Sequence, residues 1–217
     1  MVSYRELFGF LAKAPALPPR APSAVPWKLD TTQWSPELLK RLEWRRLEEV
    51  CVAYFEALGF ATRVERAGAD GGVDIGLVAE GGEQASVLVQ CKAWDAYGIG
   101  IKRLLALSAA MAAAGVGEGV LVTSGRFTPE AKAFAAKHHI GLIDGTALLA
   151  KFAELPTEKG LALLRFATEG DFVTPTCPAC AVKMISRQST QGGRKFWGCR
   201  NYPRCKQTIY PTSYAPA

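Results

Sequence analysis

The stretch Gly68-Ala69-Asp70-Gly71-Gly72-Val73-Asp74 opens a strand-like segment, and the next such segment ends in Gln90-Cys91-Lys92. Asp74 offers a hard anionic oxygen of the kind that binds Mg²⁺, and Gln90 offers a neutral amide oxygen. Lys92 offers a compact cation that can stabilise the charge developing on a phosphate in a transition state. The combination predicts a metal site that acts on a phosphate ester.

Alternation along the second segment places Gln90 and Lys92 on one face of a strand, with their side chains about 7 Å apart. Polar groups are costly on a face that helices cover, which favours a functional role, although a Gln-x-Lys motif is also common by chance. Asp70 has a plainer interpretation, because an aspartate before two glycines can satisfy the backbone donors of a turn. We therefore expect Asp74, and not Asp70, to bind the metal.

The register of the hairpin between the two segments decides whether these side chains meet. Residues directly opposite each other in an antiparallel pair point to the same face. A two-residue turn at Gly81-Gly82 would place Asp74 opposite Val89, and Asp74 would then face away from Gln90 and Lys92. We therefore predict a loop with an odd number of residues, or a β-bulge, that places Asp74 opposite Gln90.

The surrounding sequence predicts an α/β fold, in which a mixed sheet is flanked by helices. A helix is predicted from Ser35 to Leu58, because Ser35 can cap it and Pro36 suits its first position. Strands are predicted at 60–65, 73–79, 86–92, 119–123 and 140–143, with helices at 101–114 and 128–138 and weaker helical patterns at 146–166. A β-α-β crossover after a hairpin produces such a sheet.

Two adjacent acids on the first predicted helix point in different directions. At about 100° per residue, Glu48 lies beside the apolar stripe of the helix, whereas Glu49 lies on its polar face. A carboxylate at the edge of a buried stripe needs a partner. Helix geometry leaves two interpretations of Glu48 open, a salt bridge to a nearby arginine and a role at the metal site.

Four motifs in this order resemble the Mrr-type restriction endonuclease domain of the PD-(D/E)XK nuclease superfamily, over about residues 41–150. They are Trp44-Arg45-Arg46-Leu47-Glu48, the 68–74 stretch, Gln90-Cys91-Lys92 and Val122-Thr123-Ser124-Gly125-Arg126-Phe127-Thr128. The resemblance implies a restriction-endonuclease-like fold and Mg²⁺-dependent hydrolysis of DNA by water. It places the active site at Glu48, Asp74, Gln90 and Lys92, with Asp74 and Gln90 on Mg²⁺, Lys92 on the phosphate oxygens and Glu48 assisting through a water molecule.

The C-terminal tail carries two cysteine pairs, Cys177-Pro178-Ala179-Cys180 and Cys199 with Cys205, separated by 18 residues. This spacing suits one tetrahedral Zn²⁺, and four thiolates leave no open position, so the zinc is expected to be structural. Disulfides would need an oxidising compartment, and the first residues do not look like a signal peptide. Cys51 and Cys91 look like small buried hydrophobes.

The tail also resembles the C-terminal zinc ribbons of bacterial type IA topoisomerases, through its cysteine pairs, Phe196-Trp197-Gly198 and Tyr202-Pro203. The resemblance implies DNA binding, often to single strands. From Pro175 onward the chain has seven basic and no acidic residues, leaving 19 basic against 20 acidic elsewhere, so the tail carries the net charge of +6. Aromatic rings among these cations offer stacking faces. The residues expected at DNA are Arg187, Arg194, Lys195, Trp197, Arg200, Tyr202 and Arg204.

The same aromatic residues have an alternative role, because a small ribbon has little other core. Phe196 is expected to fold the ribbon, and Trp197 fits either purpose. Judged by charge alone, a basic segment such as this tail is more often a solvated surface than a binding site.

The sequence thus predicts three parts: a proline-rich arm or linker at 1–34, a nuclease domain at 35–168 and a zinc-ribbon DNA-binding domain at 175–212. No apolar run approaches the length of a membrane span, so we expect a cytoplasmic protein that does not bind a membrane. Its expected partner is DNA. Homo-oligomer formation, and restriction versus repair, stay open. The alternative function is a non-catalytic DNA-binding or scaffold protein that retains the nuclease fold.

Overall fold

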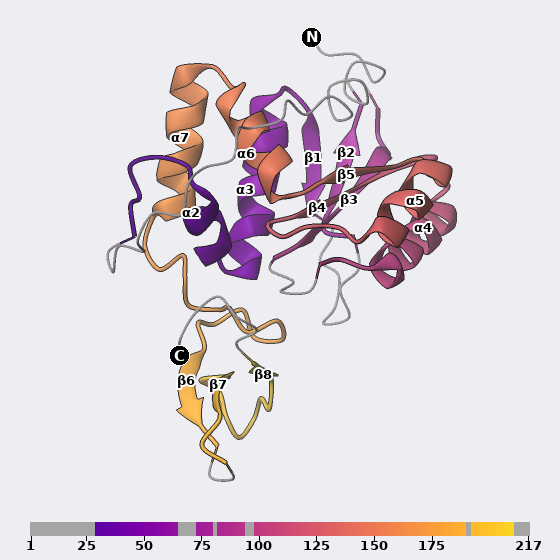
Figure 1. Ribbon diagram of the computed structural model, residues 1–217. Coiled ribbons are helices and arrows are strands. Elements are labelled where there is room, and N and C mark those ends of the chain that lie inside the picture. The colour runs from indigo at the N-terminus through magenta and orange to yellow at the C-terminus, as the bar shows by residue number, and fades with distance from the viewer. Residues whose placement is uncertain (1–28, 65–72, 80–81, 94–97, 190–191, 211–217) are drawn as a thin grey trace.

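The computed structural model describes residues 29–64, 73–79, 82–93, 98–189 and 192–210 (Figure 1). Most of the predicted arm, Asp70 with its neighbouring glycines, and Gly81 of the predicted hairpin loop lie outside these ranges. A five-stranded sheet in the order β1-β2-β3-β4-β5 forms the centre of the larger part of the molecule. A three-stranded sheet forms the smaller, C-terminal part.

The larger sheet is mixed, as the sequence predicts. Its strands are β1 (Ala61–Val64), β2 (Ile75–Val78), β3 (Ala85–Lys92), β4 (Glu118–Thr123) and β5 (Ile140–Ile143). The pairs β1-β2 and β2-β3 are antiparallel, whereas β3-β4 and β4-β5 are parallel. Helices α4 (Ile101–Ala114) and α5 (Pro129–Lys137) connect the parallel strands. The predicted α/β class, with a mixed sheet flanked by helices, is confirmed.

The prediction of one continuous helix from Ser35 to Leu58 is wrong, because the chain forms two helices there. α2 spans Pro36–Arg41 and α3 spans Trp44–Ala57. Leu42 has an extended ψ of 125°, and Glu43 starts α3 by accepting a hydrogen bond from its first turn. A side-chain cap therefore begins a new helix where neither glycine nor proline interrupts the sequence.

Two apolar cores fill the space on the two sides of the sheet. On one side, α2, α3, α6 (Gly145–Ala153) and α7 (Thr157–Thr168) pack against Val87, Val89 and Cys91 of β3. On the other side, α4 and α5 pack around Leu88 of the same strand. Successive residues of β3 thus face opposite helix layers, as the period of two requires. Among the helices of the described ranges, none is long and apolar enough to cross a membrane.

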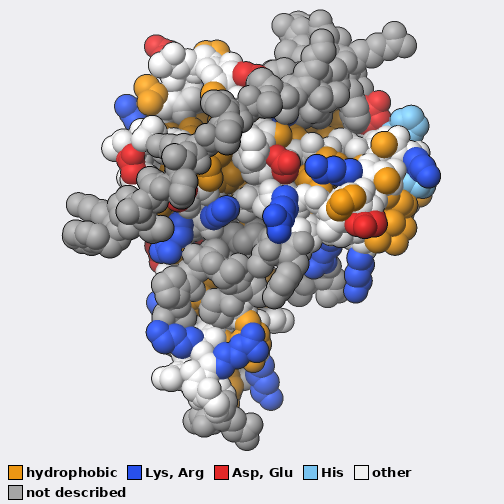
Figure 2. Space-filling model, viewed as in Figure 1, with side chains coloured by type: hydrophobic (Ala, Val, Ile, Leu, Met, Phe, Trp, Pro, Cys, Tyr) orange, Lys and Arg blue, Asp and Glu red, His pale blue; other side chains and the backbone are white. Residues whose placement is uncertain are grey.

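The C-terminal sheet is a small ribbon of three antiparallel strands. These are β6 (Ile185–Gln188), β7 (Lys195–Gly198) and β8 (Thr208–Ile209). Trp197 packs against the buried Cys177, Met184 and Cys199, whereas Phe196 lies with its ring centroid 5.9 Å from that of Tyr210. Neighbouring residues of a strand face opposite sides, so Trp197, and not Phe196 as expected, fills the ribbon core. Lys and Arg side chains lie on the ribbon and on the adjoining edge of the larger part (Figure 2).

Candidate active site and zinc centre

The pairing of β2 with β3 has the register that the sequence predicts. Ile75 lies opposite Val89 and Leu77 opposite Val87, but Val78 lies opposite Ala85, so a β-bulge interrupts the ladder. This is the register in which a regular strand would carry Asp74 opposite Gln90, although the pairing itself begins at Ile75. The prediction of an odd register is confirmed, and the bulge is the feature that produces it.

Asp74 lies where β2 separates from β3. Its backbone N–H still donates to Val89 O at 3.0 Å, but its carboxylate Oδ2 accepts the next β3 amide, that of Cys91, at 2.6 Å. A backbone N–H points along the sheet and not above or below it, so this bond draws the carboxylate into the gap beside β3. Asp74 and Gln90 are both buried, and Gln90 is only 1% exposed. The carboxylate is therefore held between the positions of Gln90 and Lys92.

Glu48 on α3 lies close enough to this strand end to feel the charges of Asp74 and Lys92. Burial raises the pKa of Glu48 to about 8, the charge of Asp74 adds to the rise, and the Lys92 ammonium opposes it. Burial also raises the pKa of Asp74. The Lys92 charge, the Cys91 N–H and a hydrogen bond with Glu48 each lower this pKa, but they do not cancel the effect of burial. The structure thus brings Glu48, Asp74 and Lys92 within electrostatic reach of one another, and Gln90 lies two residues before Lys92 on β3.

The salt-bridge interpretation of Glu48 applies instead to its neighbour. Arg45 and Arg46 each place Nε 3.5 Å from a carboxylate oxygen of Glu49. Glu49 is partly exposed, as its place on the polar face of the helix predicts. Glu48 is left facing Asp74 and Lys92, which favours the role at the metal site.

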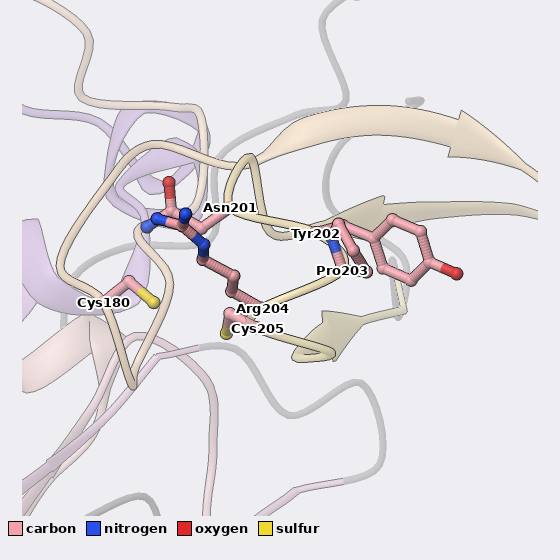
Figure 3. Close-up of a pocket in the computed structure, with 6 residues that line it drawn as sticks. All are labelled: Cys180, Asn201, Tyr202, Pro203, Arg204 and Cys205. Atoms are coloured by element: carbon pink, nitrogen blue, oxygen red, sulfur yellow. The ribbon is translucent and has the colours of Figure 1, made fainter.

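The four tail cysteines form a second centre. Their Sγ atoms all lie within 4.8 Å of one another, and Cys177 Sγ is 3.7 Å from Cys205 Sγ. A tetrahedral zinc with bonds of about 2.3 Å has sulfur–sulfur edges of about 3.8 Å, so the cluster fits this metal. Beside it lies an open pocket of about 420 Å³, across which Arg204 extends toward Asn201 while the Tyr202 ring points away (Figure 3). The arrangement matches a closed structural zinc site.

Several of the residues expected at DNA form pairs on the ribbon surface. The Arg187 guanidinium lies 5.5 Å from the ring centroid of Tyr202, and that of Arg194 lies 4.9 Å from the ring of Tyr210. Tyr202 is 60% exposed. Exposed rings beside guanidinium groups can stack on nucleic-acid bases. Trp197 packs in the ribbon core instead, so its expected role at DNA receives no support from its position.

Sequence reasoning missed Glu43, a buried carboxylate that contacts both parts of the molecule. It lay inside the single helix that the sequence predicts, where an acid needs no explanation. The local sequence Leu42-Glu43-Trp44 contains no helix-breaking residue that would have revealed the cap. Its partners follow more than 130 residues later, so only the folded chain identifies them.

Comparison with protein family models shows to which family the chain belongs. Residues 39–152, more than half of the chain, match the restriction endonuclease family model Mrr_cat. The chain belongs to the Mrr restriction endonuclease family. Its Mrr domain contains Glu48, Asp74, Gln90 and Lys92. Residues 174–213 match the topoisomerase DNA-binding C4 zinc finger, so the Mrr domain is followed by a zinc ribbon.

Individual proteins are similar to this chain over part of its length. A DNA topoisomerase 1 of Pyrococcus horikoshii is 32% identical over 95 residues, covering 42% of this chain and 13% of the topoisomerase. MspJI restriction endonuclease in complex with a 27-mer oligonucleotide is 22% identical with a TM-score of 0.40, covering 65% of this chain and 34% of that one. The DNA modification-dependent restriction endonuclease AspBHI is 19% identical with a TM-score of 0.43, covering 68% and 44%. The chain spans less than half the length of each of these three proteins.

Proposed function

We propose that this protein is a metal-dependent endonuclease that hydrolyses phosphodiester bonds in DNA, and that its zinc ribbon assists DNA binding. The observation that supports the proposal is the hydrogen bond to the Asp74 carboxylate from the N–H of Cys91, which lies on β3 between Gln90 and Lys92, within a restriction endonuclease domain. We assign the nuclease domain to 35–168 and the DNA-binding ribbon to 175–212. DNA is the proposed substrate of the first and ligand of the second.

The residues at the strand end fit a Mg²⁺ ion. Asp74 offers a carboxylate oxygen and Gln90 offers an amide oxygen, which are the hard donors that Mg²⁺ prefers, and Glu48 adds a second carboxylate nearby. Burial disfavours the charged forms of both acids, and a divalent cation would offset that penalty. When bound, Mg²⁺ would polarise the phosphate and lower the pKa of water.

The side chains of the site take separate tasks in this proposal. Asp74 is fixed through Oδ2 by the Cys91 N–H, so Oδ1 is the oxygen that we assign to the cation. Lys92 ends β3 and places its ammonium where it can contact the phosphate oxygens as their charge develops. Glu48 is positioned from α3 to take a proton from the attacking water.

The ribbon supplies contacts away from the chemistry. Its surface carries Arg187 and Arg194 against exposed tyrosine rings, and Arg200 and Arg204 are exposed. Cations on such a surface bind phosphates without sequence preference, and the rings add stacking. Lys and Arg side chains on the adjoining edge of the larger part extend the positive surface beyond the ribbon (Figure 2).

Chelation tests whether the two metal sites are separate. A mild Mg²⁺ chelator is expected to stop cleavage of plasmid, methylated, branched and single-stranded DNA reversibly, while zinc stays in the ribbon. The reason is that four thiolates hold zinc far more tightly than carboxylates hold Mg²⁺. Cleavage is measured on gels and zinc content by metal analysis of the dialysed protein. Cleavage that survives chelation, or DNA binding without any cleavage on every substrate, would contradict the proposed activity.

Removing residues 175–217 tests the ribbon. The truncated protein is expected to bind duplex DNA more weakly, with a salt dependence flatter by up to ~0.9 in log–log slope for each lost phosphate contact. Metal-dependent cleavage should remain detectable at high protein concentration. The point variant Arg200→Ala is the matched control and should lose at most one contact. Equal cleavage by the truncated and whole chains at moderate salt would show that the ribbon is not the DNA-binding module.

A further inference from the structure

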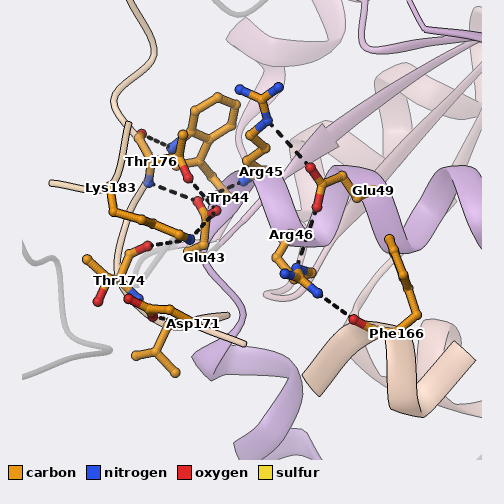
Figure 4. A network of polar contacts seen from close by, with 11 residues as sticks. Glu43, Trp44, Arg45, Arg46, Glu49, Phe166, Asp171, Thr174, Thr176 and Lys183 are labelled. Carbon is orange, nitrogen blue, oxygen red and sulfur yellow. Dashed lines mark hydrogen bonds and ion pairs between the residues drawn. The ribbon is translucent and has the colours of Figure 1, made fainter. Parts of the chain in front are cut away.

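Glu43 lies at the junction between the nuclease domain and the ribbon, where it is 2% exposed. Its Oε2 accepts hydrogen bonds from the N–H groups of Arg45 at 3.0 Å and Thr176 at 3.2 Å. Its Oε1 accepts from Thr176 Oγ1 at 2.8 Å and from Lys183 Nζ at 3.1 Å. Figure 4 shows these side chains converging on one carboxylate. Three of the four bonds therefore come from the ribbon and one from α3.

Further polar contacts fix the same junction. Trp44 Nε1 donates to Thr176 O at 2.8 Å, and the Glu43 N–H donates to Phe172 O at 2.9 Å. Lys183 Nζ also donates to Thr174 O at 2.9 Å, so a single ammonium joins the chain entering the ribbon to Glu43. The residues between α7 and the ribbon are thus bound to the start of α3 and do not form a free linker.

The two ribbon residues that contact Glu43, Thr176 and Lys183, flank the first pair of cysteines of the proposed zinc site. Thr176 directly precedes Cys177, and Thr176 and Lys183 face each other in an antiparallel bridge. The Cys177 N–H donates to Val182 O at 2.8 Å and closes this hairpin. The segment that binds zinc is therefore the same segment that docks on α3.

The burial of Glu43 makes this docking specific. A buried carboxylate needs several donors, because its hydration is lost and must be replaced. The placement of the ribbon in the structure brings the Thr176 N–H, the Thr176 hydroxyl and the Lys183 ammonium to Glu43 together. Buried polar groups of this kind can select one arrangement among several of similar packing. Glu43 also precedes Glu48 by five residues on the same helix.

We propose that Glu43 is a latch that holds the zinc ribbon in one orientation on α3, so that the ribbon and the nuclease site bind one DNA molecule at a fixed separation. Glu43 is a positioning residue, since it contacts neither the proposed metal nor the phosphate. The DNA part of this proposal rests on the proposed function, whereas the fixed orientation does not. A rigid connection raises the effective concentration of the second binding surface once the first is bound.

The latch is tested first without DNA, by ¹⁵N relaxation of the full-length, zinc-loaded protein. Ribbon and nuclease amides of the wild type are expected to share one rotational correlation time. The double variant Thr176→Val, Lys183→Met leaves the α3 cap intact. In this variant the rotational correlation time of the ribbon should fall to about half or less of the wild-type value. Lys206→Met removes an exposed ribbon lysine and should behave as the wild type. Glu43→Gln is the second variant, and should also loosen the ribbon through its weaker bond to Lys183.

A wild-type ribbon that tumbles independently would overturn the proposal, whether or not any variant folds. A zinc-loaded double variant with one shared correlation time would also overturn it.

DNA binding without divalent cations then tests whether the ribbon and the nuclease site bind one DNA molecule together. The double variant should bind a long duplex about tenfold more weakly than Lys206→Met, which has the same loss of charge. Equal affinities would overturn the fixed placement on DNA. A wild-type protein that does not cleave DNA, although its nuclease domain and ribbon share one correlation time, would contradict the endonuclease proposal and leave the role of Glu43 unchanged.

Discussion

Replacing Lys92 with alanine is expected to lower the single-turnover rate of DNA cleavage by about 10²–10³-fold, the usual cost of removing a fixed donor that stabilises a transition state. DNA affinity should change little, because Lys92 is one cation among many that can contact phosphates. The rate is measured on plasmid DNA in excess protein, and affinity by titration at the same salt concentration.

Lys102→Ala is the matched control for this variant, because Lys102 is an exposed lysine of α4 and lies outside the site. Its cleavage rate should match the wild type. A Lys92→Ala protein that cleaves as fast as Lys102→Ala would remove Lys92 from the chemistry. Equal losses of rate and affinity would assign it to DNA binding alone.

Replacing Cys199 with serine is expected to release the zinc and unfold the ribbon. A structural zinc bound by thiolates contributes about 10–16 kcal/mol to folding of such small modules, far more than the few buried side chains of this ribbon can supply. Zinc per chain should fall from one to near zero, and the NMR signals of β6 to β8 should collapse to random-coil positions. The nuclease domain should keep its fold, because its two cores lie on the five-stranded sheet.

Cys51→Ala is the control for the cysteine variant. Cys51 is buried in the nuclease core and lies outside the four-cysteine cluster, so this protein should keep its zinc and its ribbon. Zinc retained by Cys199→Ser at the wild-type level would show that the four cysteines do not form one metal site. Zinc lost from Cys51→Ala would contradict the independence of the ribbon core from the nuclease cores.

Strand alternation made the register of β2 and β3 predictable, because its period of two allows a side chain only one of two faces. Once Asp74 and Lys92 are required on one face, only an odd register satisfies the pattern, and β2 and β3 show that register. The helix at 101–114 and the strand at 140–143 were likewise predicted at their observed bounds. Local patterns were sufficient here, because the apolar residues that each of these elements buries recur at regular spacing within its own sequence.

The missed features depend on partners that are distant in the sequence. The break before α3 frees Glu43 to accept bonds from Thr176 and Lys183, partners that no helical pattern near Glu43 contains. The inward turn of the Asp74 carboxylate requires the Cys91 N–H that β2 leaves unpaired as it separates from β3. Alternation alone could assign Phe196 and Trp197 to opposite faces, but not which face meets the cysteines.

The central claim is that the strand end around Asp74 hydrolyses DNA with a bound metal. Its most direct test is Mg²⁺-dependent cleavage of plasmid DNA by the full-length protein, compared with Asp74→Asn. Asparagine keeps a side-chain oxygen for the Cys91 N–H and so preserves the buried contact, but it removes the negative charge. The account predicts cleavage by the wild type only with Mg²⁺, and none by the variant at equal DNA binding. Equal cleavage by both proteins would contradict it.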